Sequence, residues 1–153
     1  MNTNRYNPAR VTDENCTFCI PIYQRLFAWE EEQVKGLLYD LKNHFEKEGE
    51  VPYYLGMLSC IEKEGRFDLI DGQQRFTMMM LLGIVFQKEG NGWDKFLAKG
   101  NRLSFTARSK DTEYIKSLIH NNPSVGEKNE LMEHGIAVIK NFMNEEFKDD
   151  TAR

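Results

Sequence analysis

The segment from Gln73 to Gln87 constrains the fold more than any other part of the chain. It contains no proline, and its run from Met78 to Val85 is apolar, broken only by Gly83. A stretch of this kind, apolar nearly all round, predicts a helix that is covered on most sides in the middle of a domain. The run is far too short to span a bilayer, so we expect no membrane partner.

Shorter elements are expected around this helix. The spacing of apolar residues, with Gly and Pro as breaks, predicts a strand over 17–20, a helix over 30–47, strands over 53–61 and 66–70 that pair as an antiparallel hairpin, helical turns over 93–98, a strand over 102–106, and helices over 110–119 and 127–147. These elements predict an α+β fold, with a small mixed sheet, the central buried helix and further helices packed around it.

Length and charge limit the class of protein. The chain has 153 residues and a net charge of −4, which suits one domain and argues against binding nucleic acid by bulk positive charge. We expect a polar lead-in over 1–15, one domain over 16–147 and a frayed tail over 148–153. The polar first fifteen residues are not those of a secretory signal.

Cysteine usage favours a reducing compartment. Cys16 and Cys19 form a lone C-x-x-C, but neither a second pair nor a nearby histidine completes a zinc set. We therefore expect reduced, structural thiols and a cytoplasmic location. P-loop, Rossmann and nucleophile-elbow motifs do not occur.

The strongest chemical signal is the polar sequence that precedes the central helix, Asp71-Gly72-Gln73-Gln74-Arg75. A helix N-terminus offers N–H groups and partial positive charge to an anion, and glycine allows close approach of the backbone. The guanidinium group matches phosphate or carboxylate, and the aspartate is suited to holding a metal ion or orienting a water. The plainer alternative is that Asp71 caps the helix and Arg75 is its ion-pair partner.

A second signal is Tyr23-Gln24-Arg25, followed by two aromatic residues, Phe27 and Trp29. Aromatic rings beside Arg and Gln suit contact with a nucleobase or a sugar-phosphate group. For Phe27 and Trp29 we favour packing beneath the next helix, whereas for Gln24 and Arg25 both interpretations stay open.

Together these segments resemble one family. The sequence Ile20-Pro21-x-Tyr23-Gln24-Arg25-x-Phe27-x-Trp29, then Tyr54-Leu55-Gly56 and Asp71-Gly72-Gln73-Gln74-Arg75-x-Thr77, is similar to the N-terminal domain of GmrSD-type, modification-dependent restriction proteins. The resemblance is specific over residues 18–85. It implies a fold like that of ParB and sulfiredoxin, and a nucleotide-hydrolysing or nucleotide-sensing domain in bacterial defence against foreign, often modified, DNA.

The resemblance also implies roles for particular residues. Catalysis would fall to Asp71, Gln74 and Arg75, with nucleotide and phosphate contacts from Tyr23, Gln24, Arg25, Gly72, Gln73 and Thr77. An NTP and Mg²⁺ or a similar divalent cation, held at Asp71, are the implied cofactors. The implied partners are DNA and a His-Asn-His nuclease domain or subunit, of which this chain shows no trace. Met78 replaces the second threonine usual in the family, which removes one hydroxyl near the phosphates.

Two functional hypotheses follow. In the first, the chain is an NTPase whose arginines clamp phosphates while Gln73 and Gln74 orient phosphate or water. In the second, the same cleft is a non-catalytic module that recognises DNA or a partner protein.

Overall fold

A computed structural model describes residues 4–21, 27–106, 108–122 and 128–147. Its sheet has four strands in the order β2-β3-β1-β4, with the bounds β1 (Phe18–Ile20), β2 (Ser59–Lys63), β3 (Arg66–Asp71) and β4 (Leu103–Phe105). Strand β1 pairs parallel with both β3 and β4, whereas β2 pairs antiparallel with β3. The mixed sheet and the surrounding helices confirm the predicted α+β class.

The β2–β3 hairpin turns at Glu64 and Gly65, which have φ angles of 54° and 80°. A two-residue turn with two positive φ angles matches the right-handed twist of the flanking strands. The predicted hairpin is therefore confirmed, although β2 begins at Ser59 rather than at Tyr53. Residues 53–58 form no strand, and they approach the sheet as an irregular segment.

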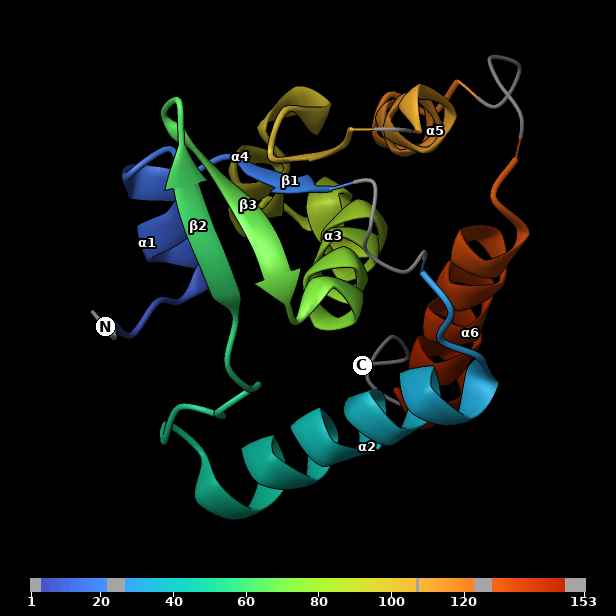
Figure 1. Ribbon diagram of the computed structural model, residues 1–153. Coiled ribbons are helices and arrows are strands. Elements are labelled where there is room, and N and C mark those ends of the chain that lie inside the picture. The colour runs from blue at the N-terminus through green and yellow to red at the C-terminus, as the bar shows by residue number, and fades with distance from the viewer. Residues whose placement is uncertain (1–3, 22–26, 107, 123–127, 148–153) are drawn as a thin grey trace.

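Helix α3 (Gln73–Phe86) follows β3 directly and is the central helix predicted from the sequence (Figure 1). It contacts both α4 (Trp93–Leu97) and α6 (Glu130–Glu146). Met78, Met80 and Leu81 on α3 are fully buried. Because α3 is apolar nearly all round, it is stable only where other elements cover it, and the structure supplies that cover.

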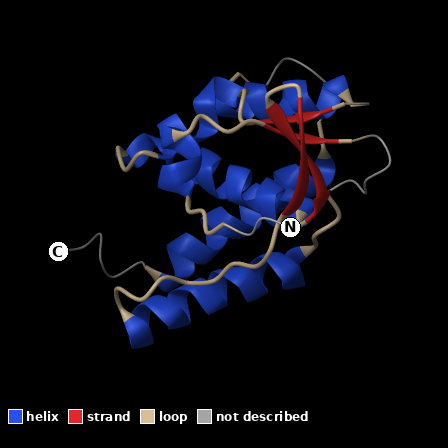
Figure 2. Cartoon of the chain, turned by 60° about the vertical axis from the view of Figure 1, so that its left-hand side comes forward, coloured by secondary structure: helices blue, strands red, loops and turns tan. Residues whose placement is uncertain are grey.

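Helix α2 (Glu31–Glu48) packs on α6 away from the sheet, which lies toward one side of the molecule (Figures 1 and 2). The Nζ atom of Lys42 on α2 forms a salt bridge with the Oε2 atom of Glu146 on α6, at 2.7 Å. Helix α5 (Ser109–Ile119) packs beside β4. Short 3₁₀ turns follow α3 and α4, at 87–89 and 98–100. Among the described residues, no helix is long and apolar enough to cross a membrane.

The structure adds a short helix, α1 (Pro8–Asp13), to the segment expected to be a polar lead-in. The Asn7 side chain accepts a hydrogen bond from the Arg10 N–H group and caps the helix, and Pro8 occupies its first position. Val11 on this helix is buried in the hydrophobic core. Asparagine followed by proline is a common helix start, so the signal was present in the sequence.

Arg102, the residue before β4, is buried. Its guanidinium group donates to the carbonyl oxygens of Phe96 at 2.7 Å, Cys16, and Lys95 at 3.4 Å. The bonds join β4 to the end of α4 and to the chain entering β1. A cation is favourable at the C-terminus of a helix, where carbonyl groups lack intrahelical partners.

The cysteines agree with the expectation of structural thiols. Cys16, Cys19 and Cys60 are unpaired, and the first two are buried. The Sγ atom of Cys19 lies 2.7 Å from the Oγ1 atom of Thr106, which ties β1 to the residue after β4. Burial raises the pKa of the Cys16 thiol, which keeps it protonated and unreactive at neutral pH.

Candidate functional site

The polar sequence predicted as a site lies where β3 ends and α3 begins. In Figure 1 the arrowhead of β3 leads directly into α3. Strands β1, β3 and β4 are parallel, so their carboxyl ends meet at this edge of the sheet. In open sheets of this type, ligands bind outside the carboxyl ends of the strands. The topology therefore places Asp71 and Gly72 where a ligand site is expected.

Gly72, and not Asp71, is the N-cap residue of α3. Gly72 has a φ angle of 88°, and the helix has no side-chain cap. The Oδ1 atom of Asp71 instead accepts a hydrogen bond from the Gly72 N–H group at 2.8 Å, and the Asp71 side chain is exposed. Among the described ion pairs, none joins Asp71 to Arg75. The plainer alternative of a capping aspartate paired with Arg75 is therefore wrong.

Arg75 is half-buried, and its guanidinium group packs against the chain at Gly56. A Cβ atom built on Gly56 would lie 2.2 Å from Nη1 of Arg75 and 2.8 Å from its Cζ. The Nη2 group donates to the carbonyl oxygen of Met57 at 3.4 Å. The guanidinium group thus packs on backbone, a position that the sequence analysis did not foresee.

Gln74 connects the two halves of the predicted site. Its Oε1 atom accepts a hydrogen bond from the Ala28 N–H group at 2.8 Å. Ala28 follows Tyr23-Gln24-Arg25 by three positions, so this bond brings the chain after the first motif to the second motif. Gln73, the first residue of α3, is buried. Both glutamines make further interactions.

Thr77 is 1% exposed, and its hydroxyl group donates to the carbonyl oxygen of Gln73 at 2.8 Å. This bond runs back along the helix by one turn. The structure therefore places Thr77 behind the first turn of α3, where it supports the site from within the core.

Tyr23, Gln24 and Arg25 lie outside the described residues, so their predicted approach to Asp71 and Arg75 stays a prediction. The neighbouring aromatic residues are described. Phe27 is 2% exposed and packs near Gly135 of α6, and Trp29 packs partly buried against the core. Packing in the core is therefore confirmed for Phe27 and Trp29, whereas their position beneath the next helix, α2, stays a prediction.

Sequence reasoning missed the contribution of residues 56–58, which we call the strap. Leu58 and Met57 lie against Gly72: a Cβ atom on Gly72 would lie 2.4 Å from Cδ2 of Leu58 and 3.0 Å from the Met57 oxygen. The strap therefore touches both the turn and Arg75. The available signal was Gly56 itself, a glycine inside an apolar and aromatic stretch, which marks close backbone approach.

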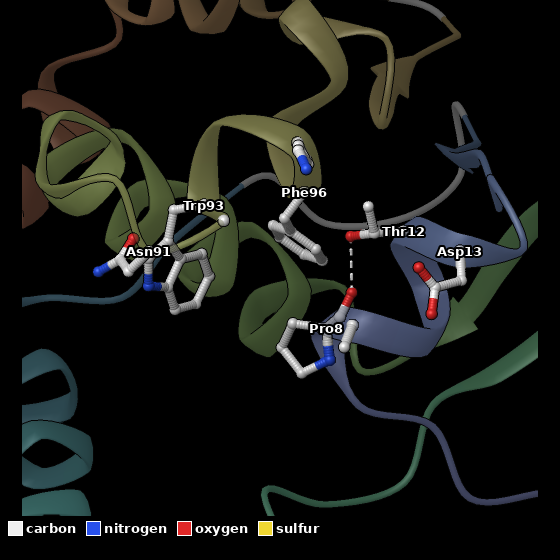
Figure 3. A pocket seen from close by; sticks show the side chains of 9 residues that line it. Pro8, Thr12, Asp13, Asn91, Trp93 and Phe96 are labelled. Atoms are coloured by element: carbon white, nitrogen blue, oxygen red, sulfur yellow. Dashed lines mark hydrogen bonds between the residues drawn. The ribbon is translucent and has the colours of Figure 1, made fainter.

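A hollow of about 360 Å³ lies between α1 and the start of α4 (Figure 3). Its lining includes the apolar side chains of Pro8, Trp93 and Phe96 and the charged side chains of Asp13 and Lys95. None of the predicted site residues lines it. Within the described chain, no cluster of three or more His, Cys, Asp or Glu side chains is arranged to hold a metal ion.

The fold and the site together define a helix-rich α+β domain with a polar turn at the carboxyl end of a central strand. A family model described as the GmrSD restriction endonuclease, N-terminal domain, matches residues 9–152. The chain belongs to this family, which confirms the resemblance carried by the two motifs. Membership places it among DNA-restriction proteins of anti-phage defence. A search of curated proteins found no match.

Proposed function

We propose that this chain is a nucleotide-binding and NTP-hydrolysing sensor domain of its restriction protein, with DNA cleavage carried out by a His-Asn-His nuclease domain or subunit outside this chain. One observation carries the proposal. A glycine-capped helix start at the carboxyl edge of the sheet lies beside an arginine that has no described carboxylate partner.

Phosphate binding follows from the first turn of α3. The first N–H groups of a helix have no intrahelical acceptor, and they carry the positive end of the helix dipole. Gly72 adopts the positive φ angle that lets the chain turn from β3 directly into α3. Arg75 adds a fixed positive charge and a planar set of donors that suits phosphate oxygens. Tyr23, Gln24 and Arg25 would contact the nucleotide from the first motif.

Asp71 fits the role of a cation ligand. Its Oδ1 atom is oriented by the Gly72 N–H group, and the exposed carboxylate points to solvent. Mg²⁺ in nucleotide sites takes one or two protein carboxylates and completes its shell with phosphate oxygens and waters, so a single aspartate suffices. When bound there, the cation would neutralise charge on the phosphates.

Gln74 and Thr77 hold this arrangement in place. The Gln74 carboxamide fixes the chain at Ala28 against the turn, and the Thr77 hydroxyl holds the Gln73 carbonyl. We assign Gln74 a catalytic role in orienting phosphate or water, as its position in the second motif suggests. Positioning and charge stabilisation account for most of phosphoryl-transfer catalysis, so these residue types are sufficient.

The test measures NTP binding and phosphate release with Mg²⁺ for the parent protein, Arg75→Ala and Arg66→Ala. Arg66 is the matched control, because it lies on β3 at the hairpin and pairs with Asp68 at 3.2 Å. We expect Arg75→Ala to lose at least about tenfold in affinity, the size of one lost charge-assisted hydrogen bond, and Arg66→Ala to behave as the parent. Equal binding by all three proteins would refute the proposal.

The recognition-module hypothesis predicts a different result. DNA would then bind without nucleotide, and its affinity would fall with salt according to the number of phosphates neutralised. With a net charge of −4, that slope should be shallow and should depend on a few arginines. DNA binding at several salt concentrations, with and without NTP, separates the two functions.

A further inference from the structure

We propose that the strap positions Arg75 for anion binding and that Gly56 is a positioning residue of the site. The inference rests on the proposed function, because it assigns Arg75 a nucleotide phosphate as its target. It gives a role to the segment between α2 and β2, where Gly56 belongs to the resemblance but had no role assigned to it.

The contact is between a guanidinium group and bare backbone. At Gly56, three atoms of Arg75 lie close to the position of an added Cβ atom: Nη1 at 2.2 Å, Cζ at 2.8 Å and Nε at 3.2 Å. All three belong to the guanidinium group, which therefore occupies the space that a side chain at position 56 would need. Real Cβ atoms do not tolerate contacts below 3.0 Å, so any other residue at position 56 would displace the group.

The next residue of the strap holds the edge of the same group. The Met57 carbonyl oxygen accepts from Nη2 of Arg75 at 3.4 Å. The same oxygen lies 3.0 Å from the site of a Cβ atom on Gly72. The Met57 carbonyl therefore lies beside both the turn at Gly72 and the guanidinium group of Arg75.

The arginine held in this way keeps donors for a ligand. Its described hydrogen bond to Met57 is long, and no described carboxylate lies within 4.0 Å of it. A guanidinium group has five N–H donors. An arginine whose orientation is already fixed by packing loses less side-chain entropy when it binds an anion than a mobile one does. The strap thus pre-organises Arg75.

The geometry also explains why position 56 is glycine. Its φ angle is 133°, a conformation that side chains rarely adopt. Backbone strain would therefore oppose a substitution, and an added Cβ atom would in addition push the guanidinium group, at the end of a flexible side chain, out of its place. The two effects are separable, because only the second depends on Arg75.

The experiment is a double-variant cycle with Gly56→Ala, Arg75→Ala and the combination, measured in the full chain. Each protein is titrated with ATP, GTP, CTP and UTP in the presence of Mg²⁺, and its melting temperature is recorded without nucleotide. We expect Gly56→Ala and Arg75→Ala each to weaken NTP binding at least about tenfold. Adding Gly56→Ala to Arg75→Ala should change the affinity by less than about twofold.

The outcomes distinguish this inference from the proposed function. If Gly56→Ala binds NTP as the parent does while Arg75→Ala does not, the positioning role is overturned and the proposed function stands. If Gly56→Ala lowers affinity by the same factor with and without Arg75, its effect bypasses Arg75, and the positioning role is again overturned. Parent-like binding by Arg75→Ala, a variant that leaves Gly56 intact, would refute the proposed function itself.

The melting temperatures keep the inference testable where Gly56→Ala folds poorly. Removing the guanidinium group removes its contact with the added Cβ atom, so Gly56→Ala should lower the melting temperature less in the Arg75→Ala background than in the parent. An equal loss in both backgrounds would show that strain, and not Arg75, requires the glycine, and would overturn the inference. Gly65→Ala is the control for strain, because Gly65 has a φ angle of 80° with no atom within 4 Å of an added Cβ.

Discussion

Replacing Arg102 with methionine should destabilise the protein by about 3–5 kcal/mol, because two strong hydrogen bonds from a charged donor are lost. The guanidinium group is 1% exposed and donates to three carbonyl oxygens. Methionine keeps most of the apolar volume against the Phe96 ring, so the change mainly removes hydrogen bonds.

The magnitude follows from the individual bonds. The bonds to Phe96 and Cys16 are the strong ones, and a hydrogen bond from a charged donor contributes about 1.5–3 kcal/mol. The bond to Lys95, at 3.4 Å, adds little. The two strong bonds therefore contribute about 3–6 kcal/mol if the surrounding structure does not adjust. Water that reaches the carbonyl groups at the end of α4 in the variant would bring the loss toward the lower half of that range.

The assay is urea unfolding, with the free energy of unfolding extrapolated to water. Arg108→Met is the control: Arg108 is exposed and lies six positions further along the chain, so its loss should be within about 0.5 kcal/mol. A loss below about 1 kcal/mol for Arg102→Met would mean that the cost of desolvating the guanidinium group cancels its hydrogen bonds. The reasoning from the carbonyl contacts would then be refuted.

Three further predictions concern other parts of the molecule. Gly72→Ala should cost about 1–3 kcal/mol in urea unfolding, because the position has a positive φ angle and its Cβ would meet Leu58. The hydrogen bond from Lys42 lowers the pKa of the Glu146 carboxyl group. The free energy of unfolding should therefore fall as the pH drops below the usual glutamate pKa, near 4.3. Glu146→Gln should flatten that loss in acid-unfolding curves. Cys60, the exposed thiol, should be the one cysteine that a maleimide labels rapidly in the native protein, and burial that raises its pKa should slow the reaction relative to a free cysteine.

Each of these predictions has its own control. Gly65→Ala reports the cost of a positive φ angle without a side-chain clash, and an equal loss at Gly72 would contradict the packing of Leu58. Glu145→Gln removes a neighbouring exposed charge, and a matching change in the acid limb would contradict the role of Lys42. Labelling of two or three thiols at one rate would contradict the burial of Cys16.

Residue types were enough to predict a candidate site at residues 71–75, because glycine, two glutamines and arginine precede an apolar helix. They did not predict how these residues are arranged. The sequence did not show that Gly72 caps the helix or that Arg75 packs on Gly56. A motif specifies which groups are present, whereas their contacts depend on which distant segment folds over them.

Segment 53–58 shows why one expected strand was wrong. Its aromatic and apolar residues have high strand propensity, which predicts extended, paired backbone. The structure instead gives Gly56 a φ angle of 133° and packs the strap on Arg75 and Gly72. Local propensity amounts to a fraction of a kcal/mol per residue, so packing against a half-buried arginine overrides it.

The amino-acid sequence alone determined the central helix, the hairpin and the position of the polar turn, because periodicity and turn residues act over a few positions. Tertiary structure alone decided that Arg102 is buried and that the strap closes on Arg75. Both results arise from groups far apart in the chain, such as Cys16 and Arg102, whose hydrogen bonds exist only once the strands have paired. Short-range patterns carry no information about such contacts.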